Sequence, residues 1–134
     1  MTIYQHAIEM LKASDTLTLS IIDEKGYPKI YPMEKVLSVD LHKVIFITKK
    51  HSNKVNSLSL SNKCCVEVHS AEDMICLSGK IAVEENEDKM KQTLPIDYIK
   101  RLENSGINKY CMLIFHTINA HLYIDDKTEN IHIK

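Results

Sequence analysis

The sequence predicts a single α+β domain built mainly on an antiparallel β-barrel. The chain has 134 residues, which is below the length at which one hydrophobic core stops growing. About seven short segments show the alternation or the apolar run of a β-strand. Helical segments occur only at the start, after the third strand and after the fifth. This order fits an antiparallel barrel better than repeated βαβ units, so we expect one domain over residues 1–134.

Composition and charge exclude several classes of partner. Hydrophobic residues make up 44% and charged residues 26% of the chain, as in ordinary globular domains. The formal net charge of -1 gives no general attraction to nucleic acid or to an anionic membrane. The most apolar stretch, 111–124, is broken by polar residues and is shorter than the roughly 20 residues that span a bilayer. With four cysteines and no export signal, we expect a reduced, cytoplasmic protein.

The first elements follow from local patterns. A capping box at Thr2 opens a short amphipathic helix that ends near Lys12. Residues 16–21 alternate as a half-buried strand, and Asp23–Gly26 forms the turn of a hairpin. The return strand contains Pro28 and Pro32, which cannot donate ladder hydrogen bonds. We therefore expect this strand to lie at an edge or to be bulged, with part of its backbone free.

The later elements are predicted with the same rules. Strands are expected over 43–48, 64–69, 75–83, 109–115 and 119–125, and helices over 52–60, 86–94 and 94–104. Gly79 marks a bulge or tight bend inside its strand. Pro95 suits a first helical position, and Gly106 suits a helix C-cap.

The segment 46–55, FITKKHSNKV, has the features of a phosphate site. It joins a buried strand to a polar helix start that is rich in cations. Ser52 can cap this helix, its first N–H groups are free, and Lys54 adds a positive charge. The same pattern is also typical of a capped surface helix with solvated lysines, so the segment alone leaves both interpretations open.

A second feature precedes it in the chain. Residues 26–33, GYPKIYPM, form an apolar strand broken by prolines, along which a planar ligand could lie. The alternative is an ordinary edge strand in which proline blocks aggregation.

Taken together, these features resemble the pyridoxamine 5'-phosphate oxidase-like family of FMN-binding split barrels, over nearly the whole chain. The resemblance lies in the order of the following motifs: Asp23-x-x-Gly26-x-Pro28, Tyr31-Pro32-Met33, Phe46-Ile47-Thr48-x-x-x-Ser52-x-Lys54, and a strand containing Gly79. The ending, with 112–115 and 119–124, is similar to small members grouped with nitroimidazole-resistance proteins and general-stress flavoproteins. The resemblance favours the phosphate interpretation of the lysine-rich segment.

The resemblance implies an α+β split barrel that binds FMN, and it assigns site residues by position. The cofactor-binding residues that it implies are Tyr31, Pro32, Met33 and Glu34 beside the flavin ring, Ile47 and Thr48 at a strand end, and Lys49, Ser52, Asn53 and Lys54 around the phosphate. Family members are typically homodimers with two flavins at the interface. A segment of the second chain around residues 74–76 is therefore expected to complete each site.

Departures from the family narrow the expected activity. True pyridoxamine phosphate oxidases usually have arginine at the position of Asn53, and they carry arginine-rich substrate segments, whereas this chain has a single arginine, Arg101. Vitamin B6 oxidation is therefore not expected. The change at Asn53 removes a fixed cation, so Lys49 or Lys50 must compensate for tight binding of FMN.

Two functions are carried forward. The first is a flavin-dependent oxidoreductase that acts on a small organic electron acceptor, in which the cofactor itself transfers the electrons. The second is a noncatalytic flavin or heme carrier, or a stress-related binding module, on the same barrel. No residue is assigned as a general acid or base. No metal site is expected, because the seven histidines lack zinc-ligand spacing and the adjacent Cys64 and Cys65 point to opposite faces of their strand.

Overall fold

The computed structural model describes residues 1–133, which form seven strands, four α-helices and one short 3-10 helix. In chain order the elements are α1 (Ile3–Ala13), β1 (Thr16–Ile22), β2 (Pro28–Val39), β3 (Lys43–Lys49), α2 (Asn53–Leu58), β4 (Lys63–Ser70), β5 (Asp73–Glu84), α3 (Glu87–Thr93), α4 (Ile96–Ser105), η1 (Ile107–Lys109), β6 (Tyr110–Ile124) and β7 (Lys127–His132). Among these residues, no helix combines the length and the apolar character needed to cross a bilayer.

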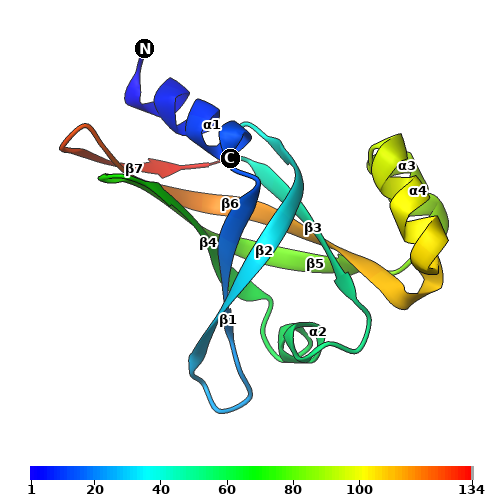
Figure 1. Cartoon of the computed structure of the whole chain (residues 1–134). Coiled ribbons are helices and arrows are strands. Elements are labelled where there is room, and N and C mark those ends of the chain that lie inside the picture. Colours follow the sequence, from blue (N-terminus) through cyan, green and yellow to red (C-terminus); the bar gives the residue numbers. More distant parts are fainter. Residues whose placement is uncertain (134) are drawn as a thin grey trace.

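Six of the strands close into an antiparallel barrel. The strand order is β3-β2-β1-β4-β5-β6-β7, and β3 also pairs with β6, which closes the ring. β7 lies outside the ring as an extra strand on the end of β6. Figure 1 shows α1 at one end of the barrel, α2 and the β1–β2 turn at the other, and the α3–α4 pair at one side. The predicted α+β antiparallel barrel is confirmed.

Two apolar clusters stabilise this arrangement. The main core fills the barrel with the inward side chains of the strands, including Phe46 and Phe115, and α1 closes one end with Ala7 and Leu11. A second cluster lies outside the barrel, where α3 and α4 cover the outer faces of β2, β3 and β6. Its centre is Met90 with residues such as Ile45 and Met112.

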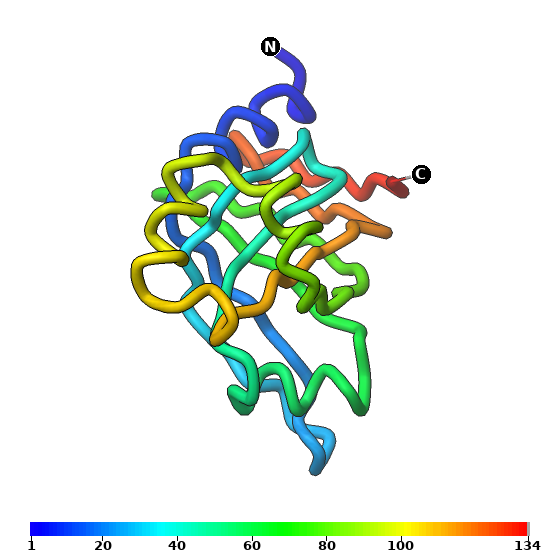
Figure 2. Tube along the Cα trace, turned by 90° about the vertical axis from the view of Figure 1, so that its right-hand side faces the viewer, coloured from blue at the N-terminus to red at the C-terminus, as the bar shows by residue number. Residues whose placement is uncertain are grey.

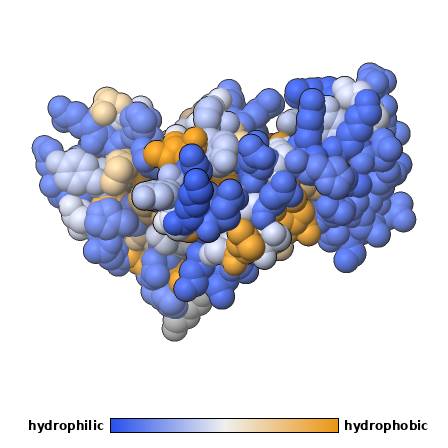
Figure 3. All heavy atoms as spheres, turned by 90° about the horizontal axis from the view of Figure 1, so that it is seen from below, coloured by the Kyte–Doolittle hydropathy of each residue, from blue (hydrophilic) through white to orange (hydrophobic). Residues whose placement is uncertain are grey.

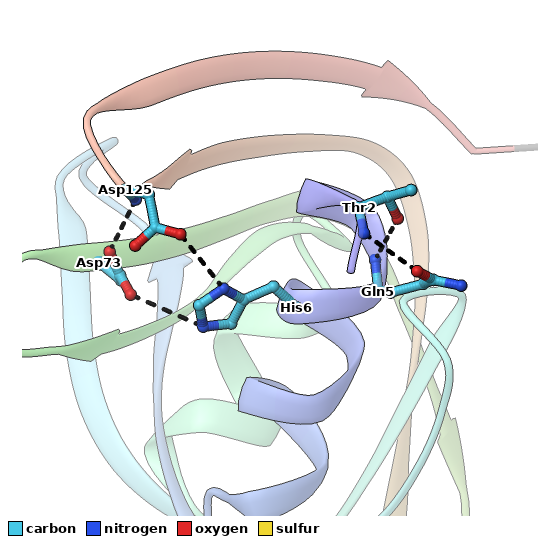
Figure 4. A network of polar contacts seen from close by, with 5 residues as sticks. All are labelled: Thr2, Gln5, His6, Asp73 and Asp125. Atoms are coloured by element: carbon cyan, nitrogen blue, oxygen red, sulfur yellow. Dashed lines mark hydrogen bonds and ion pairs between the residues drawn. The ribbon is translucent and has the colours of Figure 1, made fainter.

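Helix α1 is fixed at both ends by polar contacts. Thr2 and Gln5 form the expected capping box, with each side chain bonded to the other's backbone N–H at 3.1 and 3.0 Å. The His6 ring lies between the carboxylates of Asp73 and Asp125, at 3.9 and 3.8 Å (Figure 4). The Asp125 N–H also donates to Asp73, so this contact joins α1 to the β4–β5 and β6–β7 turns.

The C-terminal end of α1 is held by a lysine from β2. The Lys35 ammonium donates to the carbonyls of Leu11 and Lys12 at 2.6 and 2.9 Å, where the helix dipole is negative. Burial lowers the pKa of Lys35, and the Asp15 carboxylate only partly offsets this effect. The desolvation of the ammonium group therefore reduces the stability that its two hydrogen bonds contribute.

We expect Lys35→Met to lower the free energy of unfolding by about 1–2 kcal/mol, because two helix carbonyls lose their charged donor while the aliphatic stem is kept. Urea unfolding measures the effect, with Lys12→Met as the control, because Lys12 is an exposed lysine of α1. Equal stability of the two variants would contradict this role of Lys35.

The strand with two prolines, β2, has neighbours on both sides along only part of its length. β2 lies between β1 and β3 in the sheet, so it is not an edge strand along its whole length. Its pairing with β1 covers residues 28–34, but its pairing with β3 begins only at Lys35 and contains a register shift between Lys35 and Leu37. The segment Pro28–Glu34 therefore has a free edge on one side, where Pro32 costs no ladder bond.

Some boundaries differ from those predicted. The two strands expected over 109–115 and 119–125 are one continuous strand, β6, and β7 was not predicted. Of the polar residues between the two predicted parts, His116 is exposed and Thr117 is buried, and both lie next to the register shift at Ser78/Gly79. Pro95 lies one position earlier than predicted, as the N-cap of α4, while Gly106 caps that helix with a φ of 92°. The bulge predicted at Gly79 is confirmed.

Candidate functional site

The groove at the end of the barrel opposite α1 contains part of the predicted site. In Figures 1 and 2, α2 lies beside the β1–β2 hairpin at this end of the molecule. Between them is a groove of about 740 Å³, lined by Asp23, Glu24, Lys25, Tyr27, Lys29, Tyr31, Asn53, Asn56 and Ser57. This volume is in the range of roughly 300–1,000 Å³ that is usual for small-molecule pockets.

One wall of the groove is the free edge of β2. Lys29 and Tyr31 line it, and both belong to the segment that has β1 on one side and no strand on the other. Extended backbone without a neighbouring strand has N–H and carbonyl groups left over. The sequence predicted such free backbone from the two prolines.

The opposite wall is the short helix α2. The Ser52 hydroxyl caps this helix by accepting from the Val55 N–H at 3.4 Å, which leaves its own O–H able to donate. Val55 and Leu58 pack against the main core, and this contact turns Asn53 and Asn56 toward the groove. The helix predicted over 52–60 is thus confirmed in a shorter form.

A cation lies over the aromatic ring of the groove. The Lys54 ammonium is 5.0 Å from the centroid of the Tyr31 ring, within the range of a cation–π contact. The Tyr31 ring itself is half-buried and packs against the main core. The Tyr31 ring therefore limits the positions that the Lys54 ammonium can occupy, and it joins the two predicted motifs across the groove.

The other predicted site residues are distributed over three surroundings. Met33 and Thr48 are buried with their side chains on the inner side of the barrel. Ile47 packs in the cluster beneath α3 and α4, and Glu34 forms an ion pair with Arg101 of α4 at 3.6 Å. Pro32 and Lys49 are exposed. Tyr31 and Asn53 line the groove, the Lys54 ammonium lies over the Tyr31 ring and Ser52 caps α2, whereas the side chains of Ile47, Met33 and Glu34 face elsewhere.

Sequence reasoning missed several groove residues, although a signal for them exists. Lys29 has the same strand parity as Tyr31, so both face the same side of β2. Asn56 and Ser57 follow Asn53 by three and four residues, which places them on one helical face. Extending the predicted motif by these two periodicities identifies the missing residues.

Charge around the groove is mixed rather than uniformly basic. Lysines at 25, 29 and 54 surround it, while Asp23 lies at the hairpin turn. The Asp23 carboxylate accepts from the N–H groups of Lys25 and Tyr27 at 2.9 and 2.8 Å, so its charge is engaged within the turn. Seen from this end, the surface is mostly hydrophilic, with hydrophobic patches between the polar side chains (Figure 3).

The four cysteines are free thiols of two kinds. Cys64 is buried while its neighbour Cys65 is half-exposed, so they point to opposite faces as predicted. Burial raises the pKa of the Cys64 thiol to about 12, and burial followed by the Glu85 carboxylate raises that of Cys111 to about 11. Their ordinary value is 9.0.

These shifts predict alkaline destabilisation. Because the folded thiols hold their protons above the pH at which unfolded thiols lose them, their stabilising effect is complete below about pH 9 and is lost as pH rises toward 11–12. We expect the Cys64→Ala/Cys111→Ala variant to show a smaller fall in unfolding free energy between pH 8.5 and 10.5 than the parent, by up to about 1.4 kcal/mol per pH unit for each thiol. Urea unfolding across this range measures it, and parallel pH profiles would contradict it.

Within residues 1–133, no three His, Cys, Asp or Glu side chains are grouped so as to hold a metal ion. The groove offers ammonium groups, carboxylates, hydroxyls, amides, aromatic rings and free strand backbone.

The sequence and the fold were compared with those of known proteins. No protein-family model and no curated protein matches the sequence. Among solved structures, a Clostridium acetobutylicum protein of the pyridoxinephosphate oxidase family, related to general stress protein 26 of B. subtilis, has a TM-score of 0.83 at 22% identity, over 97% of this chain and 94% of its own. General stress protein 26 from Bacillus anthracis has a TM-score of 0.78 at 16% identity, over 99% of this chain and 100% of its own.

The fold is the split barrel of the pyridoxamine phosphate oxidase-like proteins. The resemblance predicted from the sequence motifs is confirmed at this level. A heme-binding protein from Mycobacterium smegmatis shares the split barrel too, with a TM-score of 0.77 at 10% identity, over 98% of this chain and 58% of its own.

Proposed function

We propose that this split barrel binds FMN in the groove between β2 and α2 and acts as a flavin-dependent oxidoreductase on a small organic electron acceptor. The observation that carries the proposal is the contact between Tyr31 and Lys54. It brings the strand motif and the cationic helix motif together in one groove of suitable volume. The same two motifs gave the family resemblance in the sequence.

The residues present fit the phosphate end of FMN. Asn53, which lines the groove, can supply an amide donor, and its neighbours in the chain, Ser52 and Lys54, can supply an O–H donor and a positive charge. Lys49 lies at the end of β3, where its exposed ammonium can add to the local positive charge. Together these groups can replace the cation lost at Asn53.

The ring end of the cofactor is assigned to the strand edge. The backbone of the segment Tyr31–Glu34 and the end of β3 at Ile47 and Thr48 would position the ring, because most of those side chains face away from the groove. When bound, FMN supplies the hydride and electron chemistry, which no side chain of this chain can supply. The protein's own task is to bind, orient and shield it.

We further propose that the protein is a homodimer in the cytoplasm. The dimer is supported by the open side of the groove, which a segment around residues 74–76 of a second copy would complete. The cytoplasmic location is supported by the four cysteines, which form no disulfide. Sedimentation equilibrium tests the dimer, and a monomer at micromolar concentration would contradict it.

The second candidate is a noncatalytic carrier of flavin or heme. The heme-binding protein of Mycobacterium smegmatis, which shares the fold, is the observation that favours a heme carrier. A carrier needs the groove but not turnover, so the two functions differ in kinetics rather than in architecture.

Spectra and kinetics separate these candidates. The protein is purified, its visible spectrum is recorded, and it is titrated separately with FMN and with hemin. The oxidoreductase proposal predicts a yellow protein that oxidises NADH or NADPH with a nitro compound or quinone faster than free FMN does. Flavin binding without such turnover would favour the carrier, and a heme absorption band without flavin would contradict the FMN assignment.

A further inference from the structure

A row of basic side chains crosses the outer face of the barrel, away from the groove. Lys63 of β4 lies directly opposite Lys80 of β5, and Lys80 lies opposite His116 of β6. Lys43 of β3 pairs with His116 on its other side. Like charges directly opposite in a sheet are destabilising, so a cross-strand lysine pair needs a compensating charge.

The surroundings do not supply this compensation. In the part of the chain that the structure describes, no carboxylate forms an ion pair with Lys63, Lys80 or Lys43. The nearest residues on the same face, two positions along each strand, are all uncharged: Ile45, Cys65, Ser78, Ala82, Ile114 and Ile118. The row is therefore open to an anion from outside the chain.

An apolar hollow adjoins the row. It has a volume of about 300 Å³ and is lined by Ser20, Ile22, Lys63, Cys64, Cys65, Ser78, Gly79, Lys80, Ile118 and Asn119. The register shift at Ser78/Gly79 interrupts the regular pleat between β5 and β6 beside the hollow. The two lysines form part of its lining, and Ile22 and Ile118 are among its apolar residues. None of the lining residues belongs to the groove between β2 and α2.

We propose that this hollow is a second ligand site, which binds a small amphipathic anion with its apolar body on Ile22 and Ile118 and its charged group at Lys63 and Lys80. The volume suits a molecule with one or two rings or a short aliphatic chain. A carboxylate or sulfonate would relieve the repulsion between the two ammonium groups, so charge and shape select the same class of ligand. The hollow shares no residue with the groove between β2 and α2, but Ser78 lies two positions from Cys76 on the same strand face, so the site would adjoin the subunit contact of the proposed homodimer.

Two fluorescent probes that differ in one charged group test the proposal. 1-Anilinonaphthalene-8-sulfonate carries an anionic sulfonate, and N-phenyl-1-naphthylamine has the same ring system without it. We expect the protein to bind the sulfonate at least tenfold more tightly than the neutral amine. In the Lys63→Gln/Lys80→Gln variant the sulfonate should bind about tenfold more weakly while the neutral probe is unaffected.

Three controls keep the result specific. Lys91→Gln removes an exposed lysine from α3 and should change neither affinity. Lys54→Ala removes one of the three lysines around the groove and should leave the binding of both probes unchanged. Ile22→Asn should weaken both probes, since it removes apolar contact.

Several outcomes would overturn the proposal. Equal affinity for the two probes, or a sulfonate affinity that Lys63→Gln/Lys80→Gln leaves unchanged, would show that the lysine pair does not bind the anion. If neither probe binds and the same double variant converts a dimer into monomers in sedimentation, the face is a contact between subunits and not a ligand site.

Discussion

Replacing Gly79 with alanine is expected to lower the free energy of unfolding by about 3 kcal/mol, and Tm by roughly 10 °C. A Cβ at this position would lie 2.0 Å from the carbonyl oxygen of His116 and 3.0 Å from the ring of Phe115. The first of these atoms belongs to the backbone of β6, so it cannot move away as a flexible side chain would. The strands β5 and β6 must therefore move apart at the bulge.

Two variants separate this collision from other effects. Ser78→Ala changes the exposed neighbour of Gly79 in the same strand and should stay within about 0.5 kcal/mol of the parent. Gly26→Ala places alanine at a φ of 86° in open space, which costs about 1 kcal/mol from the backbone alone. Thermal and urea unfolding of the three variants measure the effects, and a loss below 1 kcal/mol for Gly79→Ala would mean that the bulge relaxes freely.

The second large effect concerns the cofactor. Lys54→Ala is expected to weaken FMN binding by about 1.5–3 kcal/mol, or roughly 10- to 150-fold in Kd, because it removes a charge-assisted hydrogen bond to the phosphate. Stability should change little, since the side chain lies at the surface of a short helix over the Tyr31 ring. Fluorescence titration of FMN gives the two dissociation constants.

The control for this prediction is Lys50→Ala. Lys50 is in the same basic segment and its backbone N–H bonds to the Lys109 carbonyl, whereas the Lys54 ammonium lies over the ring of Tyr31, which lines the groove. Removal of the Lys50 side chain should weaken FMN by no more than a few fold. Equal losses for Lys54→Ala and Lys50→Ala would mean that general charge, and not a contact from Lys54, attracts the phosphate.

The fold could be predicted largely because the strands are short and their patterns are local. The alternation over residues 16–21, the Asp23–Gly26 turn and the C-cap at Gly106 each depend on a few neighbouring residues. The structure agrees with the sequence at all three. Such features are decided by backbone conformation within one turn, before tertiary contacts form.

The predictions that were wrong concern features that depend on contacts between distant segments. β6 continues through residues 116–118 because its neighbours β3 and β5 supply ladder bonds there and β7 pairs with it from Asn119 on, which no local pattern reveals. β2 is internal in the sheet but free over Pro28–Glu34, since β3 pairs with it only from Lys35. Both facts depend on which strands become neighbours.

The candidate site divides in the same way. Of the residues that the sequence motifs predicted, Tyr31 and Asn53 line one groove, and the Lys54 ammonium lies over the Tyr31 ring. The motifs did not show that the Ile47 side chain would be covered by α3 and α4, because that depends on packing between distant segments.

The comparison of FMN with riboflavin tests the central claim most directly, since the two molecules differ only by the phosphate. If the groove at Lys54 binds that phosphate, the protein should bind FMN at least about 100-fold more tightly than riboflavin, as expected for two charge-assisted hydrogen bonds. The difference should shrink at high salt, which screens the charges. Equal dissociation constants for FMN and riboflavin, or no binding of either, would contradict the account.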